Sequence, residues 1–170
     1  KSLAEYDAAS DRYRQLETVR QFAAERLAAS GEEEALRARH FDVHAALAES
    51  AINRLIGPEQ KAWMARLGRE RENMLAAHAW LGRAPMRAAG RERAAMILVL
   101  PMLVVCSLDG TLELGFQVAT EALARPAAGA LDLQRCRLLL QACQLAYLHG
   151  RYAEARTWGE EGLAIAVALA

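Results

Sequence analysis

The sequence predicts an all-α protein of about seven helices, arranged as stacked antiparallel hairpins. Apolar residues recur at steps of three or four almost throughout the chain, whereas strand-like alternation is nearly absent. Glycine and proline divide this pattern into helix-sized segments. The chain has 170 residues, of which 54% are hydrophobic, and this is enough for a continuous core. The exception to the helical pattern is Arg12 to Leu16, which could end a β-wing.

The first predicted helix spans about Gln15 to Ala29 and ends at Ser30-Gly31. Ser30 and Glu33 have the spacing of a capping box, which predicts the start of a second helix. The apolar stripe of this second helix is expected to comprise Leu36, His40, Val43, Leu47, Ala51 and Leu55. Gly57-Pro58 ends it, because glycine stops a helix and proline suits the first turn of the next one.

The third helix begins there and ends at Gly82 and Pro85. Its predicted stripe comprises Trp63, Leu67, Met74, Ala77 and Leu81. A fourth helix over 87–107 contains Pro101, for which we expect a kink or a division. The turn Asp109-Gly110 follows, and further helices are expected over 111–125, 131–149 and 152–169.

Gly110 and Gly150 are 40 residues apart and precede similar runs, GTLELGFQVATEALA and GRYAEARTWGEEGLA. Such repetition predicts helix pairs that bury their apolar faces by stacking on their neighbours. The segment LLLQACQLAYLHGRYAEARTWGEEGLAIA resembles a tetratricopeptide-type repeat, with Gly150 at the turn, Tyr152 two positions later and Ala155 where the two helices touch. The unit before it departs from that pattern, because Gly115 stands where alanine is expected. The resemblance implies a tetratricopeptide-like α-solenoid fragment over 31–170.

A second resemblance covers most of Arg12 to Leu81. The phrases RYRQLETVRQFAAERLAASGEEEALRARHFDVHAALAES and GPEQKAWMARLGRERENMLAAHAWL are similar to the arm-proximal segment of bacterial STAND-class ATPases, including AfsR- and LuxR-type transcriptional regulators. This resemblance implies that residues 1–30 form a linker and the end of a winged-helix module. Residues 31–170 would then form a protein-interaction and sensing arm.

The ATPase module of such a regulator is not encoded in this chain. The phosphate-binding pattern G-x-x-x-x-G-K-[ST] does not occur, and the only lysines are Lys1 and Lys61. We therefore expect no nucleotide hydrolysis, no cofactor and no enzymatic activity from the chain itself. The sequence also lacks GxSxG and CxxC, so covalent catalysis has no support.

Charge and hydropathy narrow the expected partners. Lysine plus arginine equals aspartate plus glutamate at 21 each, so a charged partner would need a local patch. The apolar run Ala94 to Cys106 is shorter than the roughly 18 residues of a membrane span, and Pro101 interrupts it. The first eleven residues lack an apolar signal core, so we expect a cytoplasmic protein.

Three cysteines without CxxC spacing, Cys106, Cys136 and Cys143, indicate buried free thiols.

Two groups of polar residues are candidate sites. His40 and His44 are four residues apart and could share a metal, but no third ligand is evident, and a structural or surface role is the simpler interpretation. Arg83, Arg87 and Arg91 form a basic stripe if helical, and this is the candidate partner-binding patch. A solvated helix face explains the same stripe. Aromatic residues that would stack on bases are not interleaved with it, so direct nucleic-acid contact is not expected.

The sequence thus favours a non-enzymatic interaction and sensing domain of a cytoplasmic ATPase-type regulator. Its expected partners are another protein, neighbouring domains or a small-molecule inducer, and self-association through exposed apolar ends is plausible. The alternative is an independent helical protein that binds a small ligand near Ala94 to Cys106. A metal-dependent enzyme using His40 and His44 is a third, weaker hypothesis. Trp63, Trp80 and Trp158 are expected to be core residues, although they could also line a groove.

Overall fold

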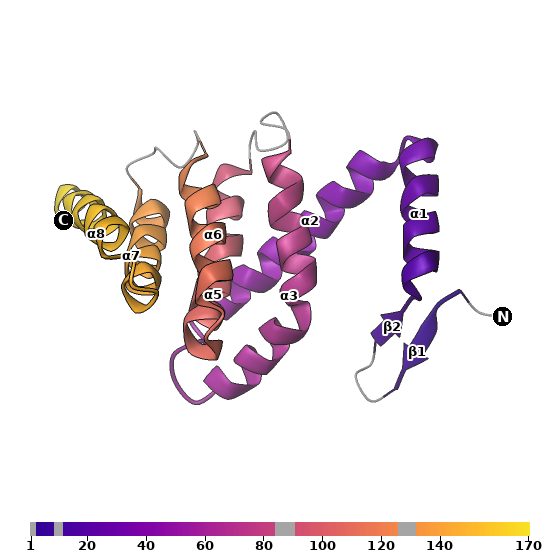
Figure 1. Cartoon of the computed structure of the whole chain (residues 1–170), viewed down its shortest axis with the longest axis horizontal. Coiled ribbons are helices and arrows are strands. Elements are labelled where there is room, and N and C mark those ends of the chain that lie inside the picture. Colours follow the sequence, from indigo (N-terminus) through magenta and orange to yellow (C-terminus); the bar gives the residue numbers. More distant parts are fainter. Residues whose placement is uncertain (1–2, 9–11, 84–90, 126–131) are drawn as a thin grey trace. The chain divides into compact units, whose positions relative to one another are not determined.

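The computed structural model describes residues 3–8, 12–83, 91–125 and 132–170. The chain forms two compact units, Lys1–Arg39 and His40–Ala170. The described elements are strands β1 (Glu5–Asp7) and β2 (Arg12–Arg14) and helices α1 (Glu17–Ser30), α2 (Glu33–Ile52), α3 (Gln60–Gly82), α5 (Glu92–Asp109), α6 (Leu112–Leu123), α7 (Leu133–Leu148) and α8 (Tyr152–Ala168). The predicted all-α class is confirmed, and Figure 1 shows the helices.

The first unit contains a short β-hairpin followed by α1. Strands β1 and β2 pair antiparallel with Tyr6 opposite Tyr13, and the two rings lie 5.2 Å apart. The strand predicted near Arg12 is therefore present, whereas β1 was not foreseen because three residues are too few to display an alternating pattern. No residue of α1 is buried.

The predicted capping box at the start of α2 is wrong. Ser30 belongs to the last turn of α1, where its hydroxyl donates a hydrogen bond to the carbonyl oxygen of Leu27 at 2.8 Å. The same hydroxyl accepts a hydrogen bond from the backbone N–H of Glu32 at 3.2 Å, not from Glu33. Ser30 therefore stabilises the turn between the helices and leaves the acidic first turn of α2, with Glu33 and Glu34, uncapped by it.

The buried face of α2 matches the prediction at Ala51 and Leu55 and differs from it nearer the start of the helix. Val43, expected in the stripe, is 64% exposed, and Leu36 is exposed as well. The residues that α2 and the turn after it bury are Phe41, His44, Ala45, Ala48, Ala51 and Leu55. The prediction followed the large aliphatic residues, whereas the helix packs through alanines around Phe41. The ring of Phe41 lies 5.9 Å from that of Trp80 on α3, so this face holds α2 against α3.

Helix α3 follows its prediction, because all five residues of its predicted stripe are buried. Helix α5 continues through Pro101 as a single helix, so the expected division does not occur. Proline lacks an N–H, and the carbonyl of Ile97 consequently loses its usual helical donor. Helix α5 packs against α3, α6 and α7, which makes it the central helix of the second unit. In Figure 1, α3, α5 and α6 lie side by side.

The last four helices form two pairs, α5–α6 and α7–α8, and α7 also packs against α5 and α6. Gly110 and Gly150 make the turns within the pairs, with φ of 81° and 80°. At Gly150, its N–H bonds to the carbonyl of Tyr147, and the N–H of Arg151 bonds to that of Ala146. This is the Schellman arrangement. It favours glycine because the residue at this position has a left-handed φ, which is strained for residues that carry a Cβ.

Close packing joins the two pairs. A Cβ atom on Gly115 of α6 would lie 2.4 Å from Cδ1 of Leu145 on α7 and 2.8 Å from Cβ of Cys106 on α5. Glycine is therefore required where the three helices meet. In addition, Leu123 of α6 and Trp158 of α8 pack against the buried residues Cys136, Leu139 and Ile165. Within the described part of the chain, no helix is both long and apolar enough to cross a lipid bilayer.

Candidate partner-binding groove

A groove of about 460 Å³ lies among the end of α2, α5 and α7. We call it the α2–α5–α7 groove. Its lining residues come from three separate stretches of the second unit. They are Ile52, Asn53, Leu55, Ile56 and Gln60 around the end of α2, Leu100, Pro101, Val104, Ser107 and Leu108 on α5, and Arg137, Leu140, Gln141 and Gln144 on α7.

The groove has a buried apolar floor and an exposed apolar rim. Leu55, Leu100 and Pro101 are buried and form part of the lining. Ile56 is 86% exposed, and Leu108 and Leu140 are exposed as well. Large exposed aliphatic side chains beside a concave surface are typical of interaction sites, because their burial by a partner is favourable.

Half of the polar residues of the lining lie on α7, and the others are Asn53, Gln60 and Ser107. Gln144 and Arg137 are exposed, and Gln141 is half-buried. The hydroxyl of Ser107 donates to the carbonyl of Leu103 at 2.9 Å, so its proton is used within α5. Of the described residues that line the groove, only Arg137 carries a charge. The site therefore offers an apolar groove with one guanidinium and four amides, those of Asn53, Gln60, Gln141 and Gln144, that could orient a bound group.

The sequence placed a possible pocket near Ala94 to Cys106, and the structure brings Leu100, Pro101 and Val104 of that segment into the groove. It did not foresee Ile56, Leu140 or Arg137. One signal was available for Leu140, because Leu138, Leu139 and Leu140 are consecutive and a helix cannot turn three successive residues to one side. Leu138 and Leu139 are fully buried, which leaves Leu140 on the rim.

The predicted basic patch is only partly described. Arg87 lies outside the described residues, and Arg83 is an exposed residue in the turn after α3. Arg91 lies with its Nε 3.3 Å from Oδ1 of Asp42 on α2, and its guanidinium is 5.8 Å from the ring of Trp80. Arg91 thus contributes to packing inside the second unit. A joint role of the three arginines in partner binding stays a prediction.

His40 and His44 lie one turn apart on α2, with ring centroids separated by 4.3 Å. Nδ1 of His44 lies 2.7 Å from the carbonyl oxygen of His40, which can only accept, so the ring donates there. Its Nε2 lies 3.5 Å from Oε2 of Glu70 on α3, and His44 is buried. In the described residues, no group of three or more His, Cys, Asp or Glu side chains is placed to hold a metal. These contacts give His44 a structural role between α2 and α3.

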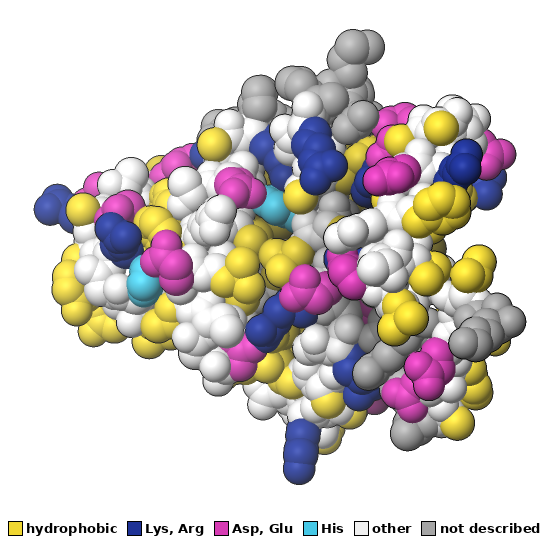
Figure 2. All heavy atoms as spheres, turned by 45° about the vertical axis from the view of Figure 1, so that its right-hand side comes forward, with side chains coloured by type: hydrophobic (Ala, Val, Ile, Leu, Met, Phe, Trp, Pro, Cys, Tyr) yellow, Lys and Arg dark blue, Asp and Glu magenta, His cyan; other side chains and the backbone are white. Residues whose placement is uncertain are grey.

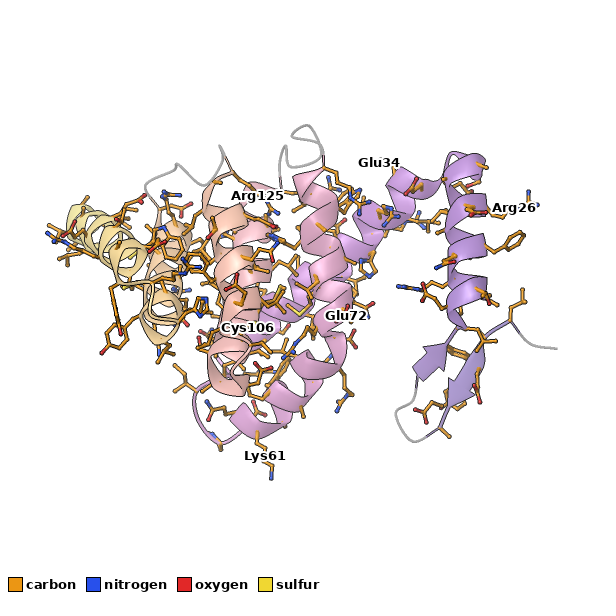
Figure 3. The ribbon with its side chains drawn as sticks, in the orientation of Figure 1. Arg26, Glu34, Lys61, Glu72, Cys106 and Arg125 are labelled. Carbon is orange, nitrogen blue, oxygen red and sulfur yellow. The ribbon has the colours of Figure 1, made fainter. Side chains whose placement is uncertain are left out.

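A second buried histidine, His78 on α3, lies in a polar cluster with Glu121 of α6 and with Arg125, two residues after the end of α6. Nε2 of His78 is 3.1 Å from Oε2 of Glu121, and Nη2 of Arg125 is 3.1 Å from Nδ1 of His78. Arg125 also donates to the carbonyl oxygen of His78 at 2.9 Å. Figure 3 labels Arg125 at the end of α6 nearest the top of the view.

The geometry of this cluster selects one form of the histidine. Arginine can only donate, so Nδ1 must accept, and the single proton of a neutral ring sits on Nε2 and is donated to Glu121. Burial, and secondarily the charge of Arg125, lowers the pKa of His78 to about 4, although Glu121 opposes the shift. Burial likewise lowers the pKa of Arg125, with Glu121 opposing it. The cluster joins α3 to α6 and lies outside the groove lining.

The remaining sequence candidates are structural. Cys106 and Cys136 are buried free thiols, as predicted, and Cys143 is half-buried. Trp63 and Trp80 are buried core residues, whereas Trp158 is half-buried. On the face drawn in Figure 2, charges of both signs are interspersed with hydrophobic side chains. Among the residues that the structure describes, the α2–α5–α7 groove is the candidate site that combines a buried apolar floor with an exposed apolar rim.

Comparison with known proteins links this chain to transcriptional regulators. Over 69 residues, 41% of its length, it is 45% identical to two proteins of Mycobacterium tuberculosis (strains H37Rv and CDC 1551) and one of Mycobacterium bovis. Each carries the provisional description HTH-type transcriptional regulator. The match spans only 8% of the length of each of these relatives. No family model and no solved structure matches the chain.

Proposed function

We propose that this chain is a non-enzymatic interaction and sensing segment of a cytoplasmic helix-turn-helix transcriptional regulator of the STAND ATPase type. The α2–α5–α7 groove carries this proposal, because it offers an apolar, partly exposed concave surface. It belongs to a chain of which 69 residues are similar to proteins described as HTH-type transcriptional regulators. The tetratricopeptide-like repeat of residues 31–170 would supply the scaffold, and residues 1–30 would close a winged-helix module.

In this proposal the groove binds an apolar segment of a partner protein or of a neighbouring domain. Ile56, Leu108 and Leu140 would lose water against the partner, and Arg137 would pair with an acidic group at its edge. Binding regulates only if the partner has different affinity for the active and inactive states of the regulator. The segment then shifts the balance between those states without performing chemistry itself.

The test is regulated transcription by the natural protein carrying Ile56→Asp. Ile56 is 86% exposed, so the substitution should leave folding intact while placing a charge on the groove rim. We expect induced expression of a reporter gene to lose its response. Val43→Asp is the matched control, because Val43 is 64% exposed but absent from the lining. A normal response from Ile56→Asp would refute the proposal.

A second candidate function is the binding of a small apolar ligand in the same groove. Its volume of about 460 Å³ falls within the range of roughly 300–1,000 Å³ usual for small-molecule sites. A compound present at 100 times its Kd should stabilise the isolated chain by about 2.7 kcal/mol. A thermal-shift screen should then find a compound that stabilises the unmodified chain and not Leu108→Asp. Equal stabilisation of both proteins would place the ligand elsewhere.

A further inference from the structure

The outer face of α7–α8 exposes a group of large apolar side chains. Leu140 is 51% exposed, Leu163 64%, and both Tyr147 and Tyr152 are exposed as well. These four residues line a shallow depression of about 610 Å³, together with Cys143, Gln144, Ala155, Arg156, Gly159 and Glu160. We call this surface the α7–α8 face. Apart from Leu140 and Gln144 it shares no residue with the α2–α5–α7 groove.

The 40-residue repeat relates this face to a surface that is covered inside the same molecule. Shifting by 40 residues superposes α7 on α5 and α8 on α6 along the sequence. Leu140 then corresponds to Leu100, which is only 4% exposed, and Leu163 corresponds to Leu123. Leu123 packs against the buried cluster contributed by α7 and α8. At Leu123, the second helix pair therefore covers the part of the first pair that corresponds to Leu163 of the α7–α8 face.

The contacts that cover the first pair are specific. Leu145 of α7 fills the space above Gly115, and the ring of Trp158 on α8 lies 5.5 Å from that of Phe116. Within this chain, the structure that packs on the first pair is therefore a helical hairpin, α7–α8. The established interface between α5–α6 and α7–α8 is the template for its geometry.

We propose that the α7–α8 face is a docking surface for a helical hairpin supplied by another polypeptide segment, which packs on it as α7–α8 packs on α5–α6. The occupant presents an apolar cluster to Leu163, in the place that Cys136, Leu139 and Ile165 take against Leu123. The other exposed aromatic and aliphatic side chains of the face lose water on docking.

Differences between the two pairs define the chemistry of this hairpin. Ala155 stands where the first pair has Gly115. The residue of the docking hairpin that takes the place of Leu145 must therefore be smaller than leucine. Arg156 stands where the first pair has Phe116, and it pairs with Glu160 at 2.8 Å. An aromatic side chain equivalent to Trp158 would lie over this guanidinium and bind it as a cation over a ring.

The experiment extends the full chain. A second copy of residues 131–170 is appended after Ala170, so that the 40-residue spacing is kept, and the leucine equivalent to Leu145 is replaced by alanine in the copy. We expect one cooperative unfolding transition, a Tm higher by about 3 °C or more, and amide hydrogen exchange in the original α8 at least about tenfold slower, because docking adds roughly 1.4 kcal/mol or more to its protection.

The matched control is the same extended chain with Leu163→Asp, which should lose both gains while the unextended Leu163→Asp chain keeps the Tm of the unextended parent. An extended chain whose original α8 exchanges at the parent's rate would overturn the proposal. Sedimentation of the unextended chain provides a second test. A dimer that Leu163→Asp dissociates would show that a second copy occupies the face, which also overturns it.

Discussion

Acid should destabilise this protein through His78, and the effect can be calculated from the structure. The ring is buried between Glu121 and Arg125 as a neutral acceptor and donor, and its pKa is lowered from the ordinary 6.5 to about 4. Between these values the unfolded chain binds a proton on this histidine and the folded chain does not. The free energy of unfolding therefore rises with pH in this window and falls as the solution is acidified.

One pKa unit corresponds to about 1.36 kcal/mol, so the complete effect of His78 is about 3 kcal/mol. Between pH 7 and pH 4.5 the expected loss is about 2 kcal/mol, since neither protonation equilibrium is complete at these limits. A side chain this deeply buried is little screened by solvent, so the figure needs no large reduction for exposure. Such a loss is a substantial part of the stability of an ordinary domain.

The assay is urea unfolding at pH 7 and pH 4.5 of the unmodified chain and of His78→Gln, whose amide can still donate to Glu121. Subtracting the two removes the titration of carboxylates common to both. We expect the unmodified chain to lose about 2 kcal/mol more than the variant over this interval. Equal losses would refute the reasoning. If the variant does not fold, NMR titration of the ring in the unmodified chain decides, and a value near 6.5 would be contrary to it.

Three further substitutions, with Gly68→Ala as a control for the first, test the packing, a turn and a helix cap, each by urea unfolding at pH 7. Gly115→Ala should cost about 2 kcal/mol by overpacking, whereas Gly68→Ala, with open space around it, should be neutral or stabilising by up to about 1 kcal/mol; equal effects would contradict the packing at Gly115. Gly150→Ala should cost about 1 kcal/mol because its φ is 80°. Asp132→Ala should cost about 1 kcal/mol, since the carboxylate accepts from the N–H of residue 135 at 2.8 Å; an unchanged midpoint would show that this cap contributes nothing.

Sequence periodicity predicted the helices well where large apolar residues lie on one side. The stripe of α3 is buried as predicted, because Trp63, Leu67 and Met74 leave one plausible face. The predicted stripe of α2 is wrong at Leu36 and Val43, because alanine marks a face poorly in sequence but packs closely in a structure. Phe41 was the more informative residue, since its ring is fully buried and determines which side of α2 meets Trp80.

The polar clusters could not be predicted from spacing. His78 is 43 residues from Glu121 and 47 from Arg125, and nothing local in the sequence connects them. The groove could not be predicted from spacing either, because its lining combines Ile56, Leu100 and Leu140 from three separate segments. Helical periodicity specifies which residues share a face of one helix, but it does not specify which faces of different helices come together.

The packing around Gly115 explains why this position departs from the repeat pattern. Alanine is expected there, and the second helix pair has it at Ala155. In the first pair, Cys106 and Leu145 occupy the space that a Cβ on Gly115 would need. In the second pair, the residue equivalent to Cys106 is Ala146, which is smaller and leaves room for Ala155. In each repeat, a larger residue on one helix is thus matched by a smaller residue on its neighbour. The two repeats can therefore differ in sequence at these positions while they keep the same hairpin geometry.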